Sequence, residues 1–476
     1  MNIFDHILSS SFMDITNLNI QFDKENPLYI QLYNFIKSEI QKGNLKANDK
    51  LPSKRKLSKA LDISQNTIES AYGQLITEGY IVSLPKKGYY VSNIQELVNI
   101  NRNKNINNEK NIKIIDYKYE FFSSRVDLES FPYSIWRKIT KDIINEDNKD
   151  LLQIGHSQGD RNLRETISSY LRFSRGVNSN ADNIVIGSGS EELIQRLINI
   201  LGTDKIYGME EPGYYKIRKI LKTYNIEVKP IKIDNQGIAV NELYKNNIEI
   251  IHITPAHQFP SGVIMPVSRR VELLSWSYEK QNRYIIEDDY DSEFRFEGKP
   301  IPALQSLDNI GKVIYIGTFS KSFAPSIRIA YMVLPEELMK IYKSKLSFLA
   351  CTVSRIEQQA LYKFIEDGYF ERHLNKMRNI YKKKRELLVM LIKKYLIGSE
   401  IIGTNSGLHL LLKVNNGMTE EELINRAKEK KIKILGLSNS YSNRNIETNT
   451  IFLGYASLSN EEIENSIILL KEAWKL

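Results

Sequence analysis

Three apolar segments of this chain each end in residues that can carry chemistry, and this arrangement constrains the fold. The segments are 248–253, 284–286 and 313–316, and each is short and rich in isoleucine, which is typical of buried strands. Helical patterns separate them, and strands that alternate with helices build a mainly parallel α/β sheet. Ligand sites in such sheets lie beyond the carboxyl ends of the strands, so we expect the residues after the three segments to meet.

The segment 313–316 leads into a loop that sets Lys321 among small hydroxyl residues. A lysine amine forms a Schiff base with an aldehyde only when it is neutral, and burial beside another cation lowers its pKa toward neutrality. Arg328 follows in the same loop and is a candidate for that cation and for a phosphate ligand, because its planar guanidinium grips phosphate oxygens. The alternative is an ordinary lysine on a surface loop.

Two further strand ends fit the same chemistry. Asp288 and Tyr290 follow the second segment, and the period of two along a strand places them on one face. A carboxylate beside a pyridine nitrogen keeps that nitrogen protonated, and a phenol can hydrogen-bond a ring hydroxyl, as pyridoxal chemistry requires. Upstream, Gly189 and Ser190 precede an amphipathic helix over 193–201, where backbone N–H groups would hold a phosphate. Taken alone, such a turn is most often only a helix cap.

From about residue 120 to its end, the chain resembles the fold-type I, aspartate-aminotransferase-like enzymes that use pyridoxal 5′-phosphate (PLP). Its ordered motifs, PGY at 212–214, HQFPSG at 257–262, EDDYDSEF at 287–294 and GTFSKS at 317–322, are most similar to the aminotransferase-like domain of MocR-type regulators, a GntR subfamily. The resemblance implies that Lys321 forms the internal aldimine, that Asp288 contacts the pyridinium nitrogen and that Tyr290 binds the ring hydroxyl. It also implies that Tyr214 stacks on the ring. The cofactor-binding set that it implies is Gly189, Ser190, Glu191, Tyr214, Asp288, Tyr290, Thr318, Ser320, Lys321 and Arg328.

The composition excludes several other classes of protein. A chain of 476 residues suggests two or three domains, and 42% hydrophobic with 26% charged residues is typical of a globular protein. No membrane span and no signal peptide is recognisable, so we expect a cytoplasmic protein. A single cysteine, Cys351, excludes an internal disulfide, and the six histidines show no metal-binding spacing, so no metal site is predicted.

Basic residues are concentrated near the N-terminus. The chain carries a net charge of +9, and the segment 27–92, with ten basic and five acidic residues, accounts for +5 of it. Such a concentration is expected of a nucleic-acid-binding domain.

The segment 27–92 also shows the pattern of a winged helix-turn-helix. Apolar residues recur at helical spacing from residue 28, Ser53 can cap a second helix, and a third helix over 65–78 is expected to bury Ile68, Tyr72, Leu75 and Ile76. Strands over 80–82 and 89–91 would flank a basic wing. The alternative is a small helical domain that packs on another part of the protein.

This segment resembles the GntR-type winged helix, and the resemblance implies contacts with a double-stranded DNA operator. Lys54 and Arg55 would contact phosphates, the start of the third helix would enter the major groove, and the wing would reach the minor groove or the backbone. The DNA-binding residues so implied are Lys54, Arg55, Gln65, Asn66, Thr67, Lys86, Lys87 and Gly88.

The predicted organisation is an arm over 1–26, the winged helix over 27–92, a flexible linker over 93–118 and an aminotransferase-like domain over 119–476. The last domain divides into a large α/β part to about 337 and a smaller C-terminal α+β part. The linker is rich in asparagine and lysine without an apolar period. The family resemblance also implies a head-to-tail homodimer.

Two functions are compatible with these sequence features. The first is a transcription regulator that senses PLP or a PLP–amine adduct, and the second is an active aminotransferase with a DNA-binding extension. The winged helix favours the first, because an enzyme needs no such module. A third possibility, a PLP storage or scaffold protein, has no supporting residue.

The residue at position 452 indicates which small molecule the second domain senses. Aminotransferases typically carry an arginine for the substrate carboxylate just before a Leu-Gly-Phe sequence, and here Phe452 precedes Leu-Gly-Tyr. A phenyl ring cannot pair with a carboxylate, so we expect poor transamination and favour PLP itself as the effector, with control of vitamin B6 synthesis or salvage. Arg218, Arg295 and Arg444 remain candidates to replace the missing arginine.

Overall fold

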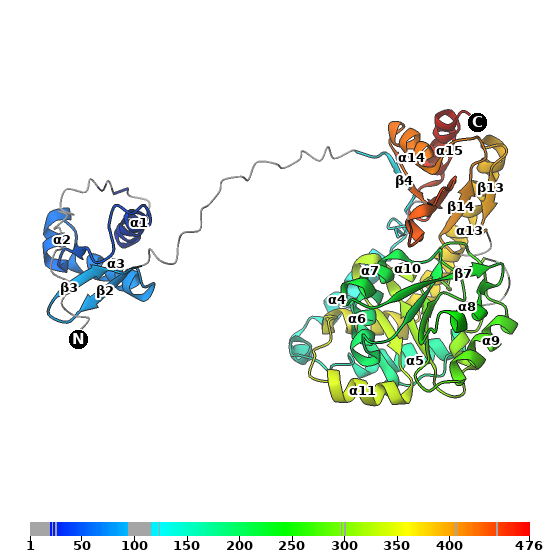
Figure 1. The fold of residues 1–476 in the computed structure, drawn as a ribbon, viewed down its shortest axis with the longest axis horizontal. Coiled ribbons are helices and arrows are strands. Elements are labelled where there is room, and N and C mark those ends of the chain that lie inside the picture. Colours follow the sequence, from blue (N-terminus) through cyan, green and yellow to red (C-terminus); the bar gives the residue numbers. More distant parts are fainter. Residues whose placement is uncertain are drawn as a thin grey trace. The chain divides into compact units, whose positions relative to one another are not determined.

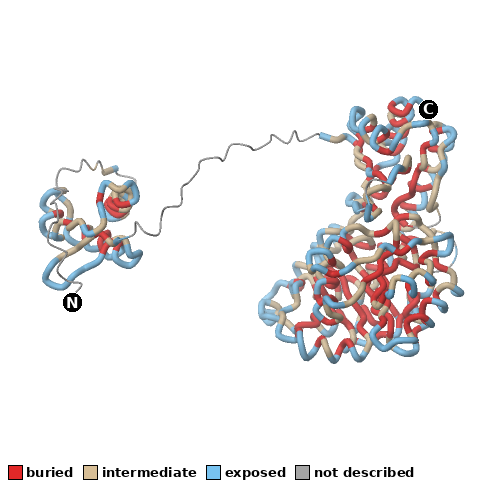
Figure 2. Tube along the Cα trace, viewed as in Figure 1, coloured by how far each residue is buried: buried red, intermediate tan, exposed pale blue. Residues whose placement is uncertain are grey.

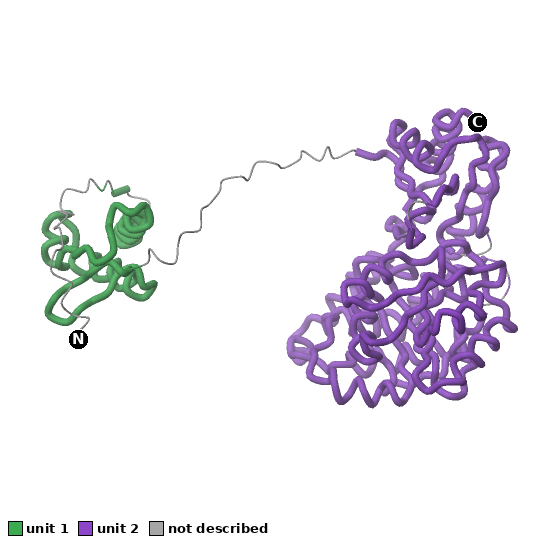
Figure 3. Tube along the Cα trace, in the orientation of Figure 1, with its two compact units in different colours: residues 1–113 green, residues 114–476 purple. Residues whose placement is uncertain are grey.

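The computed structural model describes residues 20, 22–23, 26–93, 116–122, 124–296, 298, 301–404, 407–443 and 446–476. The chain forms two compact units, residues 1–113 and 114–476 (Figure 3). Most of the predicted arm and most of the predicted linker lie outside the described residues. Within the described residues, no helix is long and apolar enough to cross a bilayer, and no group of His, Cys, Asp or Glu side chains is placed to hold a metal ion.

Within residues 28–91, the first unit packs three helices around a small antiparallel sheet with strand order β1-β3-β2 (Figure 1). Its core is formed by apolar side chains that recur at helical spacing, such as Leu32, Ile36 and Ile68, each at most 1% exposed. Ser53 and Ser64 cap the second and third helices by accepting backbone N–H groups. The elements are α1 Leu28–Gln41, β1 Lys50–Leu51, α2 Lys54–Leu61, α3 Gln65–Thr77, β2 Ile81–Leu84 and β3 Gly88–Val91.

One predicted core residue of this unit is wrong. Ile76 is 37% exposed, whereas its neighbour Leu75 is fully buried. Successive helical residues lie about 100° apart, and Ile76 falls just outside the arc of α3 that Ile68, Ala71, Tyr72 and Leu75 bury in the core. The strand β1 was also not predicted, because a two-residue strand leaves no pattern in a sequence.

The second unit is built on a sheet that has eight strands in the described part of the chain, in the order β5-β12-β11-β10-β9-β6-β7-β8. The pairs β10–β11, β9–β10, β6–β9 and β6–β7 are parallel, and β12 runs antiparallel to both β11 and β5. The carboxyl ends of β5, β6, β9, β10 and β11 therefore meet at one edge. The strands are β5 Ile184–Gly187, β6 Tyr207–Glu211, β7 Val228–Asp234, β8 Gly237–Ile238, β9 Ile250–Ile253, β10 Tyr284–Asp289, β11 Val313–Thr318 and β12 Ala330–Val333.

Alternate residues of this sheet face two helical layers, and Figure 2 shows buried residues concentrated along the strands. Ile186 and Tyr331 join the core of α5 and α12, whereas Val185 and Met332 join the core of α6 and α11. Burial on both faces explains why the strands read as continuous apolar runs. The helices of this part are α4 Tyr133–Ile143, α5 Arg161–Arg175, α6 Ser190–Leu201, α7 Tyr215–Thr223, α8 Val240–Lys245, α9 Val267–Tyr278, α10 Phe319–Ser322, α11 Glu336–Leu346 and α12 Arg355–Glu366, with 3-10 turns η2 Glu146–Leu152, η3 Ala181–Asn183, η4 Leu304–Leu307 and η5 Pro325–Ile327.

The C-terminal part carries a second sheet with the antiparallel order β13-β14-β17-β16. The short strand β4 Tyr119–Glu120 pairs in parallel with β15, and the Lys118 N–H donates to the Lys431 carbonyl at 2.9 Å. The end of the predicted linker thus packs on the second unit. The elements are α13 Tyr369–Tyr395, β13 Glu400–Ile402, β14 His409–Lys413, α14 Glu420–Glu429, β15 Ile432–Lys433, β16 Leu435–Gly436, η6 Leu437–Ser440, β17 Thr450–Gly454 and α15 Asn460–Trp474.

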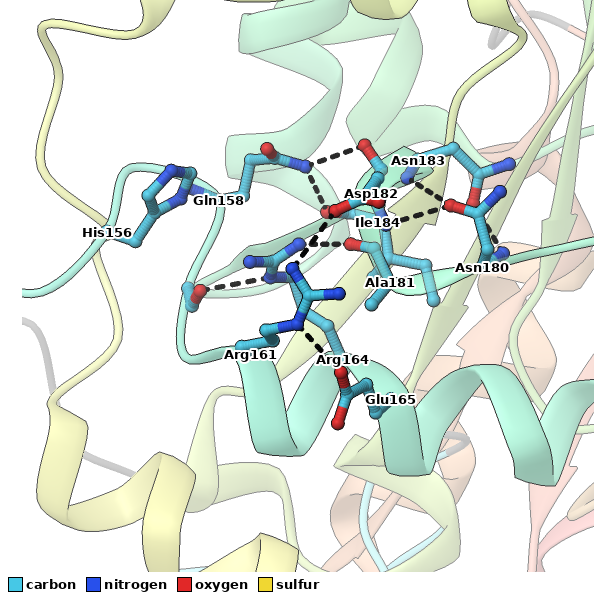
Figure 4. A network of polar contacts seen from close by, with 11 residues as sticks. His156, Gln158, Arg161, Arg164, Glu165, Asn180, Ala181, Asp182, Asn183 and Ile184 are labelled. Carbon is cyan, nitrogen blue, oxygen red and sulfur yellow. Dashed lines mark hydrogen bonds and ion pairs between the residues drawn. The ribbon is translucent and has the colours of Figure 1, made fainter.

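A buried polar network fixes the start of β5 (Figure 4). Arg164 on α5 donates from Nε to the Gly159 carbonyl at 3.0 Å and from Nη1 to the Ala181 carbonyl. Gln158 donates to the carbonyl of Ile184, the first residue of β5, at 2.9 Å. Because these groups satisfy buried carbonyls from three segments, they hold the start of β5 against η3 and the turn before α5.

Candidate functional site

A cavity of about 180 Å³ lies beyond the carboxyl ends of the central strands. All ten residues of the predicted cofactor-binding set line it, from Gly189 after β5 to Arg328 before β12. The sheet topology brings them together, as expected for strands that run in parallel. The structure adds lining residues that were not predicted, namely Ser124, Lys216, Thr254, Phe259, Asp291, Pro325, Leu408 and His409.

Lys321 stands at the cavity wall on α10, the single turn that follows β11. Dense surrounding protein lowers the pKa of Lys321 to about 8, the charge of Asp291 opposes the shift, and the cation of Lys216 adds to it. The cation that adds to this shift is therefore Lys216, and not Arg328 as predicted. A pKa near 8 leaves an appreciable neutral fraction of the amine near neutral pH, as a nucleophilic lysine requires.

The acidic run at the end of β10 is divided between two faces of the sheet. Asp288 lines the cavity, and its Oδ2 lies 3.3 Å from Nε2 of the buried His252 on β9. Asp289 points away and pairs with Arg175 at 2.8 Å. Glu287 also faces away, and it accepts backbone N–H groups of η4 at 2.8 Å. Of these three acids, only Asp288 can meet a ligand in the cavity, as the period of two predicts.

Tyr290 belongs to a second polar group at the cavity. Its Oη lies 3.0 Å from Nδ1 of His257, and the same nitrogen lies 3.1 Å from the carboxylate of Asp291. His257 is 3% exposed, and its Nε2 has no hydrogen-bond partner among the described residues. The HQFPSG segment was noted in the sequence, but nothing there indicated that its histidine would orient Tyr290.

The opposite end of the cavity forms a cradle for an anion. Gly189 has φ of +118°, and a Cβ there would lie 3.0 Å from Cζ of Arg328, so only glycine fits. Ser190 begins α6, whose first N–H groups have no partner within the helix. Thr318 accepts the N–H of Ser320 at 3.1 Å and places two hydroxyls together. Hydroxyls, N–H groups and a guanidinium fit the phosphate of PLP.

An aromatic wall borders the cavity on the side of the C-terminal sheet. The ring of Phe259 lies 5.4 Å from that of Tyr214 and 5.4 Å from that of His409. Burial first, and then His257 and Lys321, lower the pKa of His409 to about 4 although Asp291 opposes the shift, so this side chain is neutral. Phe452 does not line the cavity but stacks behind Phe259, with ring centroids 5.7 Å apart.

None of the three candidate replacement arginines lines this cavity in the described structure. Arg218 is buried in an ion pair with Glu211 at 2.5 Å. Arg295 lines a separate cavity with Glu293. Arg444 lies outside the described residues. Among the described residues at the cavity wall, Arg328 is the only arginine.

The predicted DNA-binding residues lie at the start of α2, the start of α3 and the tip of the β2–β3 hairpin. Arg55, Asn66 and Lys86 are exposed, and Lys86 has φ of +61° in the wing turn. Lys54 forms an ion pair with Glu69 at 2.8 Å, so part of its charge is neutralised within the unit. Gln65 and Lys87 are also exposed, and Thr67 and Gly88 are half-buried.

Comparison with known proteins identifies both units. The family described as "Bacterial regulatory proteins, gntR family" matches residues 28–91, and the family described as "Aminotransferase class I and II" matches residues 126–466. The HTH-type transcriptional regulator YhdI of Bacillus subtilis is 40% identical over 97% of this chain and 98% of its own. The probable rhizopine catabolism regulatory protein MocR of Rhizobium meliloti is 30% identical over 95% of this chain and 94% of its own. The chain belongs to the MocR-type subfamily of GntR regulators.

The HTH-type pyridoxine biosynthesis transcriptional regulator PdxR of Corynebacterium glutamicum is 27% identical over 84% of this MocR-type chain and 86% of its own. The solved kynurenine aminotransferase of Pyrococcus horikoshii is similar to the second unit, with 27% identity, a TM-score of 0.68, and coverage of 76% of this chain and 91% of that one. The cofactor of this MocR-type chain is PLP, and the anion cradle, the lysine and the buried carboxylate together fit its phosphate, aldehyde and pyridine groups.

Proposed function

We propose that this MocR-type regulator senses PLP itself and adjusts transcription of genes for vitamin B6 synthesis or salvage. The observation that supports this most is the composition of the cavity wall. The described wall has a complete set of groups for the cofactor, but its only arginine lies in the phosphate cradle, and its other end is aromatic and neutral. A relative named as a regulator of pyridoxine biosynthesis gives further support.

In this proposal each side chain acts on one part of the cofactor. The bound cofactor supplies an electron-withdrawing pyridine ring and an aldehyde. Lys321 provides a partly neutral amine for the aldehyde, and Asp288, held by His252, carries the negative charge beside the ring nitrogen. Tyr290 and Tyr214 position the ring, and Arg328 with the start of α6 holds the phosphate.

In this proposal the first unit binds the operator DNA. Exposed Arg55 and the wing lysines would bind phosphates of an operator, and the start of α3 would read bases in the major groove. We further propose a cytoplasmic homodimer, because two winged helices on one operator bind far more tightly than one.

An active aminotransferase is the second candidate, since Lys321 has the lowered pKa that an enzyme would use. An absorbance titration separates the two. The PLP-loaded protein is mixed with millimolar alanine, glutamate or GABA, and the visible spectrum is followed. A sensor of PLP should keep its spectrum, whereas conversion to the amino form of the cofactor within minutes would support the enzyme.

A further inference from the structure

The carboxylate of Glu191 lies where the anion cradle of the cavity converges. Its Oε2 is 3.2 Å from Nη2 of Arg328, and its Oε1 is 3.5 Å from Nζ of Lys216. The backbone N–H of Glu191 itself also contacts the carboxylate. Glu191 therefore uses a guanidinium, an ammonium and a helix N-terminal N–H, which are the kinds of donor that a phosphate uses.

Glu191 is negatively charged in this position. Burial raises the pKa of Glu191. The hydrogen bond from its own N–H and the cations of Arg328 and Lys216 lower this pKa by more, so the net shift is downward. Its side chain is 29% exposed, and the start of a helix also favours an anion there. A carboxylate and a phosphate dianion that share one set of donors in a partly buried site repel each other strongly.

The neighbouring acid, Glu192, is not placed to pair with Arg328 and Lys216. Glu192 points to the other side of α6, where it pairs with Arg196, and it does not line the cavity. Glu191 has room to move, because Arg328 and Lys216 are about half exposed and the carboxylate lies at the cavity wall. A rotation of its side chain would return both cations to a ligand without a change in the fold.

We propose that Glu191 is an internal competitor of the cofactor phosphate, which pairs with Arg328 and Lys216 in the PLP-free protein and must leave when PLP binds. This inference rests on the proposed function. A sensor must release its ligand when the ligand becomes scarce, and a competing carboxylate weakens binding without removing any group that recognises the cofactor.

The test compares cofactor binding by the full-length protein and by Glu191→Gln, an isosteric change that removes the charge. PLP-free protein is titrated with PLP and, separately, with pyridoxal, which lacks the phosphate. We expect Glu191→Gln to bind PLP roughly tenfold more tightly or better, and to bind pyridoxal as the unchanged protein does. Glu336→Gln is the matched control, because Glu336 is also in the first turn of a helix and pairs with a lysine, Lys340, but is exposed and does not line the cavity.

Glu191→Asp keeps the charge but shortens the reach to Arg328, so its affinity for PLP should lie between those of the unchanged protein and Glu191→Gln. Equal PLP affinity of the unchanged protein and Glu191→Gln would overturn the inference and leave the proposed function intact. An equal gain for pyridoxal would also overturn it, because the charge would then act on another part of the cofactor. Failure of both proteins to bind PLP would overturn the proposed function together with the inference.

Discussion

His252 and Asp288 lie on the adjacent parallel strands β9 and β10, with Nε2 of the histidine 3.3 Å from Oδ2 of the aspartate. Both residues are at most 5% exposed. The imidazole N–H thus satisfies a carboxylate that faces the cavity on its other side. We infer that His252 is a positioning residue for the group that meets the pyridine ring.

Loss of His252 should therefore affect stability and cofactor binding together. His252→Ala leaves the Asp288 carboxylate without this buried donor, and we expect the free energy of unfolding to fall by roughly 1–3 kcal/mol. His252→Gln retains an N–H donor and should recover most of the loss. Urea denaturation and the visible spectrum of the PLP-loaded protein measure the two effects, and equal behaviour of the two variants would contradict the assignment.

Lys321→Ala should abolish covalent attachment of PLP, because Lys321 is the lysine at the centre of the cofactor set. The variant should lose the visible absorbance band of the bound cofactor, and borohydride should trap no adduct. Lys340→Ala, an exposed lysine paired with Glu336, is the control and should keep both signals. Retention of a trapped adduct in Lys321→Ala would show that another lysine is modified.

The rate of PLP capture should rise with pH through about 8. The pKa of Lys321 is lowered to about 8, the ammonium form that dominates below this value is unreactive, and the neutral amine that forms above it attacks the aldehyde. Lys216→Gln removes a cation that lowers this pKa, so the midpoint should move to higher pH. Stopped-flow absorbance at several pH values gives both midpoints, and a midpoint that stays unchanged would exclude Lys216 as a contributor to the lowered pKa.

Substitutions at the predicted DNA-binding residues should affect DNA affinity and sequence specificity differently. Arg55→Ala removes one exposed phosphate ligand and should weaken binding to all sequences while reducing the salt slope by roughly one. Asn66→Ala, at the start of α3, should mainly reduce discrimination between the operator and other DNA. Fluorescence anisotropy of segment 27–92 at several salt concentrations measures both. An unchanged binding isotherm for the variant that carries both Arg55→Ala and Asn66→Ala would show that these two residues do not contact DNA.

The sequence predicted the cavity well where the signal is local. Lys321 and Tyr290 follow apolar strands and Asp288 lies near the end of one, and the parallel topology then determines that the strand ends meet. Gly189 and Arg328 were found in the same way, from turns beside strands. Phe452 was placed correctly in a strand of the C-terminal sheet, but its position behind Phe259 depends on packing between two sheets.

The residues that were missed come from packing that no short pattern encodes. His409 reaches the cavity from β14, well over a hundred residues beyond the cofactor loop of β5, and a single histidine in an apolar strand reads as an ordinary core residue. Lys216 reads as a surface lysine of α7, and only the fold places it near Lys321. His252 likewise lies inside an apolar strand, and its role depends on the register of β9 against β10.

If the regulator senses PLP, then PLP bound at Lys321 changes its affinity for DNA. The most direct test is the Kd of the full-length protein for its own upstream DNA, measured by gel shift with and without PLP, beside Lys321→Ala. We expect PLP to change the Kd of the unchanged protein, and we expect this change to be lost in Lys321→Ala. Identical Kd values with and without PLP, for a protein whose spectrum shows that the cofactor is bound, would contradict this expectation.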